Sequence, residues 1–415
     1  MVKREAVLGW LASIQRLKVT PFVFILPFLF GILAKLKHSK LWFGDYQAMA
    51  CAGLKAQAGQ PIYALDLQCH GMHPSVYVYI PVVAKITAAL EHILSEPGLF
   101  ALYLVAFITA LVALVAAPLR LAPGSWRDKM PFLVFVSGSA VMWGNVAVIL
   151  HGLVLGAALL MEVSPWLFIA AVACAAAVKP VFLTYLVLLL LADMPFWRRI
   201  GLCVVGAAAG LAPTALFVLT DPAGASQWAQ LLSHFVYEVT PGSGFYGWLA
   251  MVGLRGDTMF AQVACLAYSL VLTGAAVAIA ERLKLTAQER LWLGLSIAAL
   301  LIPRIMSQDV FLVGPGLVML ARRAAEASNL RLMPRTKWIQ TLLRYGPHIL
   351  WGLCVVTLFV SMIQNGRYST SVAFLGFSLY VIGLGAGLSG QAIGRAAGWL
   401  RDELTTGLAN SETQS

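Results

Sequence analysis

Residues 41–81 decide the fold, and they read LWFGDYQAMACAGLKAQAGQPIYALDLQCHGMHPSVYVYIP. This polar stretch follows the first apolar segment, residues 19–36, whereas most of the remaining chain is one apolar run after another. Asp45 stands where that first segment would leave a bilayer. A carboxylate at membrane depth costs roughly 2.5–3.5 kcal/mol on insertion scales and usually marks function. We therefore interpret residues 41–81 as an active-site loop that follows a first membrane span.

The composition sets the class of protein. Of the 415 residues, 60% are hydrophobic and only 11% are charged, and the mean hydropathy is +0.82. A soluble protein of this size needs far more polar surface, so we expect an all-α, multi-spanning membrane protein. The formal net charge of +11 could indicate nucleic acid. Here, however, the basic residues fall between apolar runs, as topology signals do, which favours phosphate-bearing lipids as partners and excludes nucleic acid.

The apolar runs predict ten to twelve membrane spans. They occupy residues 19–36, 76–95, 98–119, 131–161, 165–195, 200–219, 259–280, 291–303, 310–321, 345–363 and 370–390. Two runs are interrupted, at Gly144-Asn145 and at Lys179-Pro180. The threading of residues 98–161 stays open, because the basic stretch 120–129 falls on the outer side in this scheme.

Basic residues at the N-terminus and in the linkers place both termini in the cytoplasm, in the cell's inner membrane. Residues 41–75 and 221–257 are then the outer loops. Within the first, residues 45–58 predict a helix lying on the membrane and ended by Gly59. Its apolar face would carry Tyr46, Met49, Ala50, Gly53 and Leu54. We expect one domain, residues 1–404, and a disordered cytoplasmic tail, residues 405–415.

The six cysteines form no CxxC pair and no metal-ligand spacing. Cys51 and Cys69 both lie in the first outer loop, where they could pair in an oxidising compartment or remain free. The chain has no HExxH motif, no DxD pair and no paired histidine cluster, so we expect neither a metal nor another cofactor. His151 and His348 stand alone in apolar surroundings and are interpreted as core residues.

Two carboxylates stand closest to the ends of apolar segments, Asp45 and Asp309. Desolvation there can tune a carboxyl group toward general-base catalysis. The alternative is that each one only pairs with a neighbouring base, such as Lys40 or Arg304. Asp66 and Asp257 lie on the same side but farther from apolar segments.

Two basic residues, Lys179 and Arg304, are candidates for binding an anion such as a lipid phosphate. Lys179 lies deep in an apolar run before Pro180, although backbone carbonyls freed by the proline could satisfy it instead. Arg304 precedes Asp309, and a guanidinium suits bidentate phosphate contact. His234 begins an outer stretch rich in glycine and aromatic residues. That stretch is either a sugar-stacking or lid segment, or only a linker.

The polar stretch resembles the start of glycosyltransferase family 87. The resemblance lies in Asp45-Tyr46 followed by a small-residue helix, then Gly59-x-Pro61-x-Tyr63 and Tyr79-x-Pro81. Lys179-Pro180 and Pro303-Arg304 with Asp309 are similar to later features of that family. This chain has Ile80 and Asn145 where the family often has proline and glutamine, so the resemblance leaves the subfamily and the sugar open.

The resemblance implies a membrane transferase of the GT-C fold that uses polyprenyl-phosphate sugars, such as mannose donors, for envelope glycolipids or glycans. Asp45 would take the proton of the acceptor hydroxyl in an inverting transfer at the outer membrane face. Lys179, Arg304 or His234 would neutralise the leaving phosphate, so that no metal is required. Asp309, Tyr46 and Tyr79 would belong to the same substrate site.

The alternative from another class is a transporter or flippase of lipid-linked sugars or other solutes. Transporters often carry paired broken helices in two repeats. The break at Lys179-Pro180 has no evident match in the second half of the sequence, which favours the transferase.

Overall fold

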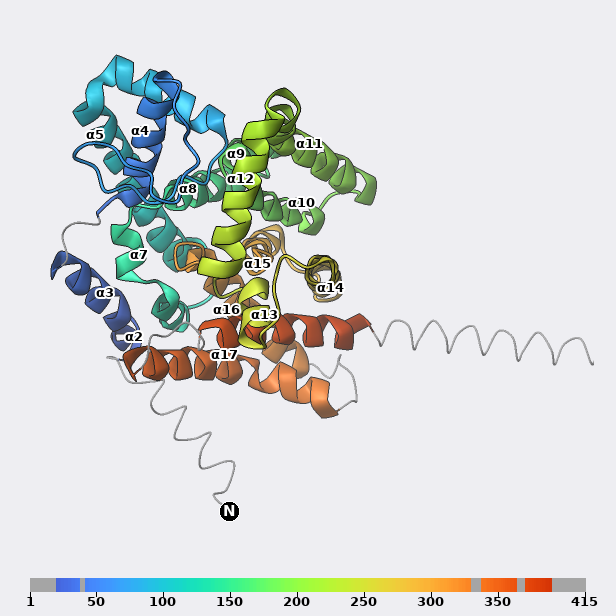
Figure 1. Ribbon diagram of the computed structural model, residues 1–415. Coiled ribbons are helices and arrows are strands. Elements are labelled where there is room, and N and C mark those ends of the chain that lie inside the picture. The colour runs from blue at the N-terminus through green and yellow to red at the C-terminus, as the bar shows by residue number, and fades with distance from the viewer. Residues whose placement is uncertain (1–19, 38–41, 330–336, 364–369, 390–415) are drawn as a thin grey trace, which may run out of the picture.

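The computed structural model describes residues 20–37, 42–329, 337–363 and 370–389, and all regular secondary structure in these ranges is helical (Figure 1). Five of the described helices are long and apolar enough to cross a membrane. They are α5 (Pro81–Leu121), α11 (Phe196–Thr220), α14 (Met259–Arg282), residues Gln340–Val360 of α17 (Lys337–Ile363), and a last helix, Thr370–Ser389. The chain is thus a helical, multi-pass membrane protein. The expected cytoplasmic tail lies outside the described residues.

Shorter helices occupy the rest of the described chain. They are α2 (Thr20–Val23), α3 (Leu26–Lys37), α4 (Gly44–Gln57), α6 (Trp126–Lys129), η2 (Met130–Phe135), α7 (Gly138–Met142), α8 (Val146–Leu159), α9 (Pro165–Val178), η3 (Pro180–Leu186), α10 (Val187–Leu191), α12 (Pro222–Ser233), η4 (His234–Val239), α13 (Phe245–Met251), α15 (Ala287–Leu300), η5 (Val310–Leu312) and α16 (Val313–Asn329). Two predicted interruptions are confirmed: α8 begins only at Val146, and α9 ends before Lys179. The ten to twelve expected spans therefore correspond to five long helices and several short or broken segments.

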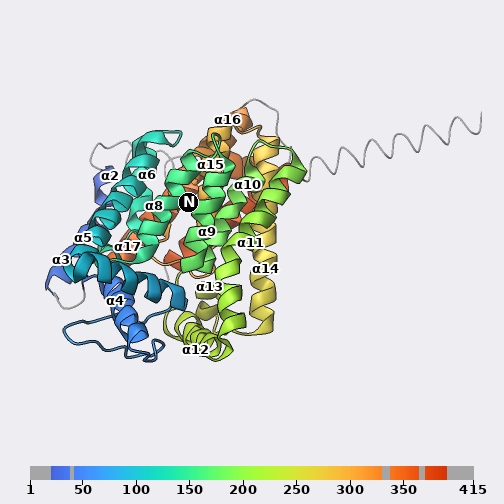
Figure 2. The ribbon, with the colours of Figure 1, turned by 90° about the horizontal axis from the view of Figure 1, so that it is seen from above.

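The molecule has two distinct ends. Helices α4, α12 and α13 lie at one end and α6 and α16 at the other, with α11 and α14 running between them (Figure 2). Helix α15 lies in the centre, and every residue from Glu289 to Leu300 is buried. The first end carries the polar stretch of residues 42–80 and is called the site end below.

Helix α5 differs from the expected pair of antiparallel spans. Residues 76–95 and 98–119 were expected to cross the membrane in opposite directions, with a turn at Glu96-Pro97-Gly98. Instead one bent helix has its non-helical residue at Ser95 (φ 62°). Its first half lies crosswise at the site end beside α4, and only the second half runs along the bundle (Figures 1 and 2). The bend falls two residues before Pro97, which has no N–H to continue the helical hydrogen bonds across it, and the chain resumes as a helix without reversing.

Helix α4 confirms the predicted helix but corrects its surroundings. At its end the Gly59 N–H donates to the Ala56 carbonyl and the Gln60 N–H to that of Lys55, which with Gly59 at φ 64° is a Schellman cap. The face expected to meet lipid packs against α5 instead. A Cβ on Gly53 would lie 3.2 Å from the Ala84 carbonyl oxygen. Small residues allow this close crossing, so Tyr46, Met49 and Ala50 are buried in protein.

Residues 221–257, the predicted second outer loop, are largely helical, because they contain α12, η4 and α13. Asp221 caps α12 through its side chain, which accepts from the Gly224 N–H at 2.9 Å. The segment after η4 packs on residues 302–305 of the second half. The Ser243 N–H donates to the Ile305 carbonyl and the Tyr246 N–H to that of Pro303. Glycine at 244 is required there, since a Cβ would lie 2.6 Å from the Ile302 carbonyl oxygen.

Candidate functional site

Asp45 lies in the first turn of α4 and is 9% exposed. Three donors face its carboxylate. The Tyr79 hydroxyl donates to Oδ2 at 2.5 Å, the Val146 N–H donates to Oδ2 at 3.2 Å, and the Ser75 hydroxyl lies 3.2 Å from Oδ1. Because Val146 is the first residue of α8, the carboxylate also stands at a helix N-terminus, which favours negative charge. The three groups that contact the Asp45 carboxylate are thus neutral.

Lys179 lies at the break between α9 and η3, and its Nζ donates to Asn145 Oδ1 at 2.7 Å. The same ammonium group lies 5.4 Å from the centroid of the Tyr79 ring, while the Tyr79 hydroxyl contacts Asp45. Lys179 experiences the charges of Asp45, Asp309 and Arg304. Four residues from three distant regions of the sequence thus influence one another electrostatically and are called the site cluster below: Asp45, Lys179, Arg304 and Asp309.

Asp309 follows the irregular segment after α15. Its Oδ1 lies 2.9 Å from His151 Nε2, and its Oδ2 accepts from the Met306 N–H at 2.8 Å. His151 Nδ1 in turn lies 2.6 Å from the Tyr185 hydroxyl. A neutral imidazole satisfies both contacts, with Nε2–H donating to the carboxylate and Nδ1 accepting from the tyrosine. His151 and Tyr185 are 1% and 0% exposed, so this chain runs into the core and positions Asp309.

Arg304 connects the same irregular segment to the second outer loop. Its Nε donates to the Thr240 carbonyl oxygen at 2.6 Å, and its Nη2 donates to the Thr240 hydroxyl. The guanidinium carbon lies 5.6 Å from the centroid of the Phe235 ring. Phe235 lies in η4 and Thr240 directly follows it. A movement of that segment would therefore change the contacts of Arg304.

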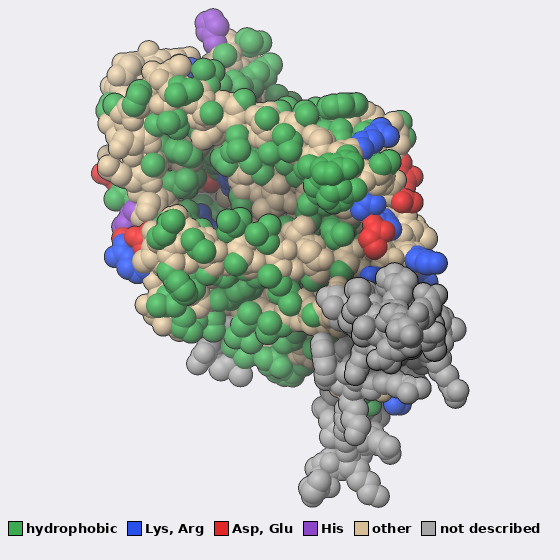
Figure 3. Space-filling model, turned by 90° about the vertical axis from the view of Figure 1, so that its right-hand side faces the viewer, with side chains coloured by type: hydrophobic (Ala, Val, Ile, Leu, Met, Phe, Trp, Pro, Cys, Tyr) green, Lys and Arg blue, Asp and Glu red, His purple; other side chains and the backbone are tan. Residues whose placement is uncertain are grey.

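Three non-helical segments meet at this cluster: residues 143–145, Lys179 and residues 301–309. Irregular backbone within an apolar bundle is tolerated only where it is buried in protein or lines a polar cavity. The space-filling view shows a hollow on one face with Lys or Arg and Asp or Glu atoms at its bottom and hydrophobic side chains around its mouth (Figure 3). This arrangement suits a ligand that has both an apolar part and a charged group.

Two of the predicted site residues lie elsewhere. Tyr46 points to the bend in α5, where its hydroxyl donates to the Glu96 carbonyl at 3.3 Å and its ring packs on Phe100 and Tyr103. Burial raises the pKa of Tyr46 to about 12. His234 is 42% exposed on η4, with Nδ1 2.7 Å from Glu238 Oε2. Both residues therefore serve local packing or surface pairing in this structure.

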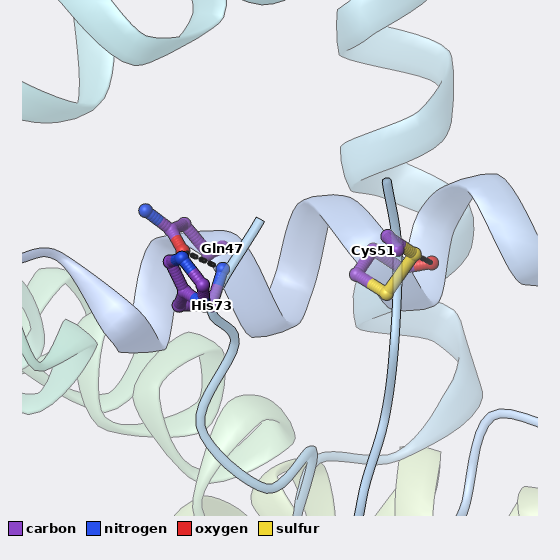
Figure 4. Close-up of a disulfide and its surroundings, with 4 residues drawn as sticks. Gln47, Cys51 and His73 are labelled. Carbon is purple, nitrogen blue, oxygen red and sulfur yellow. Dashed lines mark hydrogen bonds between the residues drawn. A yellow bond between two sulfur atoms is a disulfide. The ribbon is translucent and has the colours of Figure 1, made fainter. Parts of the chain in front are cut away.

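Cys51 and Cys69 form a disulfide, the pairing that the sequence left open. It fastens the segment after α4 onto the helix that carries Asp45. Close by, the His73 N–H donates to Gln47 Oε1 at 2.6 Å, which fastens the same segment a second time (Figure 4). The chain then leads directly to Ser75, so both links help to position a donor to Asp45.

Sequence reasoning missed several residues of the site. Ser75, Asn145 and the Val146 N–H contact Asp45 or Lys179, and His151 contacts Asp309. The apolar setting of His151 was interpreted as core packing, which is correct for its burial but omits its carboxylate partner. One sequence pattern could have indicated Asn145: an asparagine after a glycine at a predicted break is typical of the N-cap of the next helix.

Within the described part of the chain, no group of three or more His, Cys, Asp or Glu side chains could hold a metal ion. Comparison of the chain with protein-family models, with curated proteins and with solved structures finds no match.

Proposed function

We propose that this protein is a membrane-embedded, inverting glycosyltransferase of the GT-C type. The donor would be a polyprenyl-phosphate sugar, carrying mannose or another hexose or pentose, and the acceptor an envelope glycolipid or glycan. The observation that carries the proposal is that Asp45 and Lys179 each contact neutral groups instead of forming an ion pair with each other. A carboxylate held by neutral donors stands beside a lysine held by a neutral amide, at the junction of two broken segments.

In the proposed step the oxygen of the acceptor hydroxyl attacks the anomeric carbon of the donor sugar. The bond between that carbon and the phosphate oxygen breaks, and its electron pair leaves with polyprenyl phosphate. The acceptor proton passes to Asp45. Both lone pairs of Oδ2 are used by Tyr79 and Val146, so Oδ1 is the atom with an acceptor position left for the incoming hydroxyl.

Lys179 and Arg304 would stabilise the negative charge that grows on the leaving phosphate. Fixed cations in a site that excludes much of the water are more effective than cations in bulk solvent, because the local dielectric is lower. The lipid part of the donor would lie against the apolar helices while its phosphate reaches Lys179 and Arg304.

The proposed orientation puts the site end on the outer face of the cytoplasmic membrane, with both termini inside. The Cys51–Cys69 disulfide supports it, because disulfides persist in oxidising compartments.

The test is transfer by the purified protein in lipid vesicles, with radiolabelled polyprenyl-phosphate sugars and membrane glycolipids as acceptors. A new covalent glycolipid that requires Asp45 is expected. Movement of label across the vesicle membrane without any new covalent product would overturn the proposal.

That second outcome would favour a transporter of lipid-linked sugars or other solutes. One observation supports this alternative: the irregular segment 301–309 gives the second half a break that meets the break at Lys179. In addition, the buried Asp309–His151 pair is a group of the kind found in intramembrane proton relays.

A further inference from the structure

We propose that Asn145 is a positioning residue that keeps Lys179 available as a cation for a phosphate-bearing ligand. This inference rests on the proposed function and adds to it the residue that determines how strongly the site binds the phosphate. Neither the family motif nor the charged residues of the sequence indicate this role, which follows from the contacts of one turn.

The side-chain oxygen of Asn145 accepts two hydrogen bonds. This atom, Oδ1, accepts from the Ala147 N–H at 2.9 Å, as the N-cap of α8, and from Lys179 Nζ at 2.7 Å. Since both neighbours are donors, the amide must present its oxygen to them, and both lone pairs of that oxygen are then used. The lysine is thereby aimed by a neutral group that does not cancel its charge.

The backbone of the same turn fixes Asp45. The Phe43 N–H donates to the Met142 carbonyl at 3.0 Å, and the Asp45 N–H to that of Trp143 at 3.4 Å. Gly144 has φ 59°, and a Cβ there would lie 2.3 Å from the Phe43 ring. One turn therefore sets the position of the carboxylate through its backbone and that of the ammonium group through its side chain.

The nature of the partner distinguishes a ligand-binding lysine from a structural one. A carboxylate at position 145 would make the same two contacts and would also be a good helix cap. It would, however, neutralise Lys179 by a direct ion pair. The neutral amide orients the lysine equally well and leaves a net positive charge to be met by an anion from outside the protein.

The test compares Asn145→Asp, Asn145→Thr and the parent protein for binding of a short-chain prenyl phosphate, measured by calorimetry in detergent. Asn145→Asp keeps the cap and the contact to Lys179, so its melting temperature should stay within a few degrees of the parent. Its affinity for the phosphate should fall at least ten-fold. Asn145→Thr keeps a cap oxygen but does not reach Lys179, and an intermediate loss is expected.

Thr258→Asp is the matched control, because Thr258 is the N-cap of α14 and accepts from the Ala261 N–H. It adds the same charge at another helix start and should leave the affinity unchanged. Parent-like binding by a folded Asn145→Asp protein would overturn the inference while leaving the proposed function standing. Absence of prenyl phosphate binding in the parent itself would instead count against the proposed function, and the inference would fall with it.

Discussion

The site cluster differs from a group of charged residues away from the site end in how its charges are partnered. Away from the site end, Glu281 contacts both Arg199 and Arg290, at 2.9 and 2.8 Å, and Glu289 contacts Arg323 at 2.6 Å. These five residues are called the ion-pair cluster. In the site cluster Asp45 and Lys179 are near enough to interact electrostatically, yet each is held by neutral groups. Glu281 and Glu289 are thus paired directly with arginines, whereas Asp45 and Lys179 contact neutral groups and not each other.

Tyr79 is central to this separation. Its hydroxyl donates to Asp45, while its ring lies beneath the ammonium group of Lys179. A direct ion pair would be stronger in a medium of low dielectric but would leave neither charge for a substrate. The comparison therefore predicts that substitutions in the site cluster abolish activity with little effect on folding, and that substitutions in the ion-pair cluster do the reverse.

The largest effect is expected from Asp45→Asn. The substitution is nearly isosteric but removes the proton acceptor, so transfer should fall by about a hundred- to ten-thousand-fold. The measurement is the initial rate of sugar transfer at saturating donor. Asp66→Asn, an exposed residue on the same end, should remain within a few-fold of the parent. Full activity in Asp45→Asn together with an inactive Asp309→Asn would move the base to the second half of the chain.

Lys179→Gln should lower transfer by about a hundred-fold or more, as expected for loss of a group that stabilises charge in the transition state. Arg255→Gln is the matched control, since Arg255 is an exposed cation at the site end paired with Asp257 and Glu238. If both variants lost activity equally, the general positive charge of this end, and not the geometry of Lys179, would be responsible.

His151→Leu should lower transfer about ten-fold, because a buried carboxylate left without one donor costs roughly 1–3 kcal/mol and Asp309 would shift. His151→Gln retains a donor toward Asp309 and should recover much of the rate. Melting curves separate this positioning role from unfolding. Equal rates for the two variants would show that the contact with Asp309 does not matter for transfer.

The smallest effect on transfer is expected from Glu281→Gln in the ion-pair cluster. The Glu281 side chain is 47% exposed whereas that of Arg290 is 7% exposed. Solvent screening limits the loss to about 1 kcal/mol of unfolding free energy, so the melting temperature should drop by a few degrees at unchanged transfer rate. A transfer rate reduced as far as in Lys179→Gln would contradict the functional difference between the two ends.

The features that the sequence predicted are those determined by local chemistry. Pro180 lacks the N–H that would continue α9, Gly144 adopts φ 59° at the turn before α8, and Gly59 ends α4 because it adopts positive φ without strain. The breaks place Lys179, Arg304 and Asp309 in irregular backbone, and Asp45 lies in the first turn of α4. The roles predicted for these four residues stay predictions.

The features that the sequence did not predict depend on long-range packing. The bend in α5 depends on α4 lying against its first half, and the partner of His151 lies 158 residues farther along the chain. Hydropathy alone cannot distinguish an apolar helix that crosses a bilayer from one that lies across the end of a bundle. For the same reason the face of α4 assigned to lipid is packed against protein.

The large sequence separation between these contacting residues has a consequence for biosynthesis. Asp45 meets its donor at Val146 only after 101 further residues, and Asp309 lies another 163 residues beyond Val146 (309 − 146). Chains are inserted from the N-terminus onward. A chain stopped before α15 therefore has Asp45 and Lys179 in place but lacks Arg304, Asp309 and the segment that receives η4. The first half thus already supplies the neutral partners of Asp45 and Lys179, and the second half adds the remaining two charges of the site cluster.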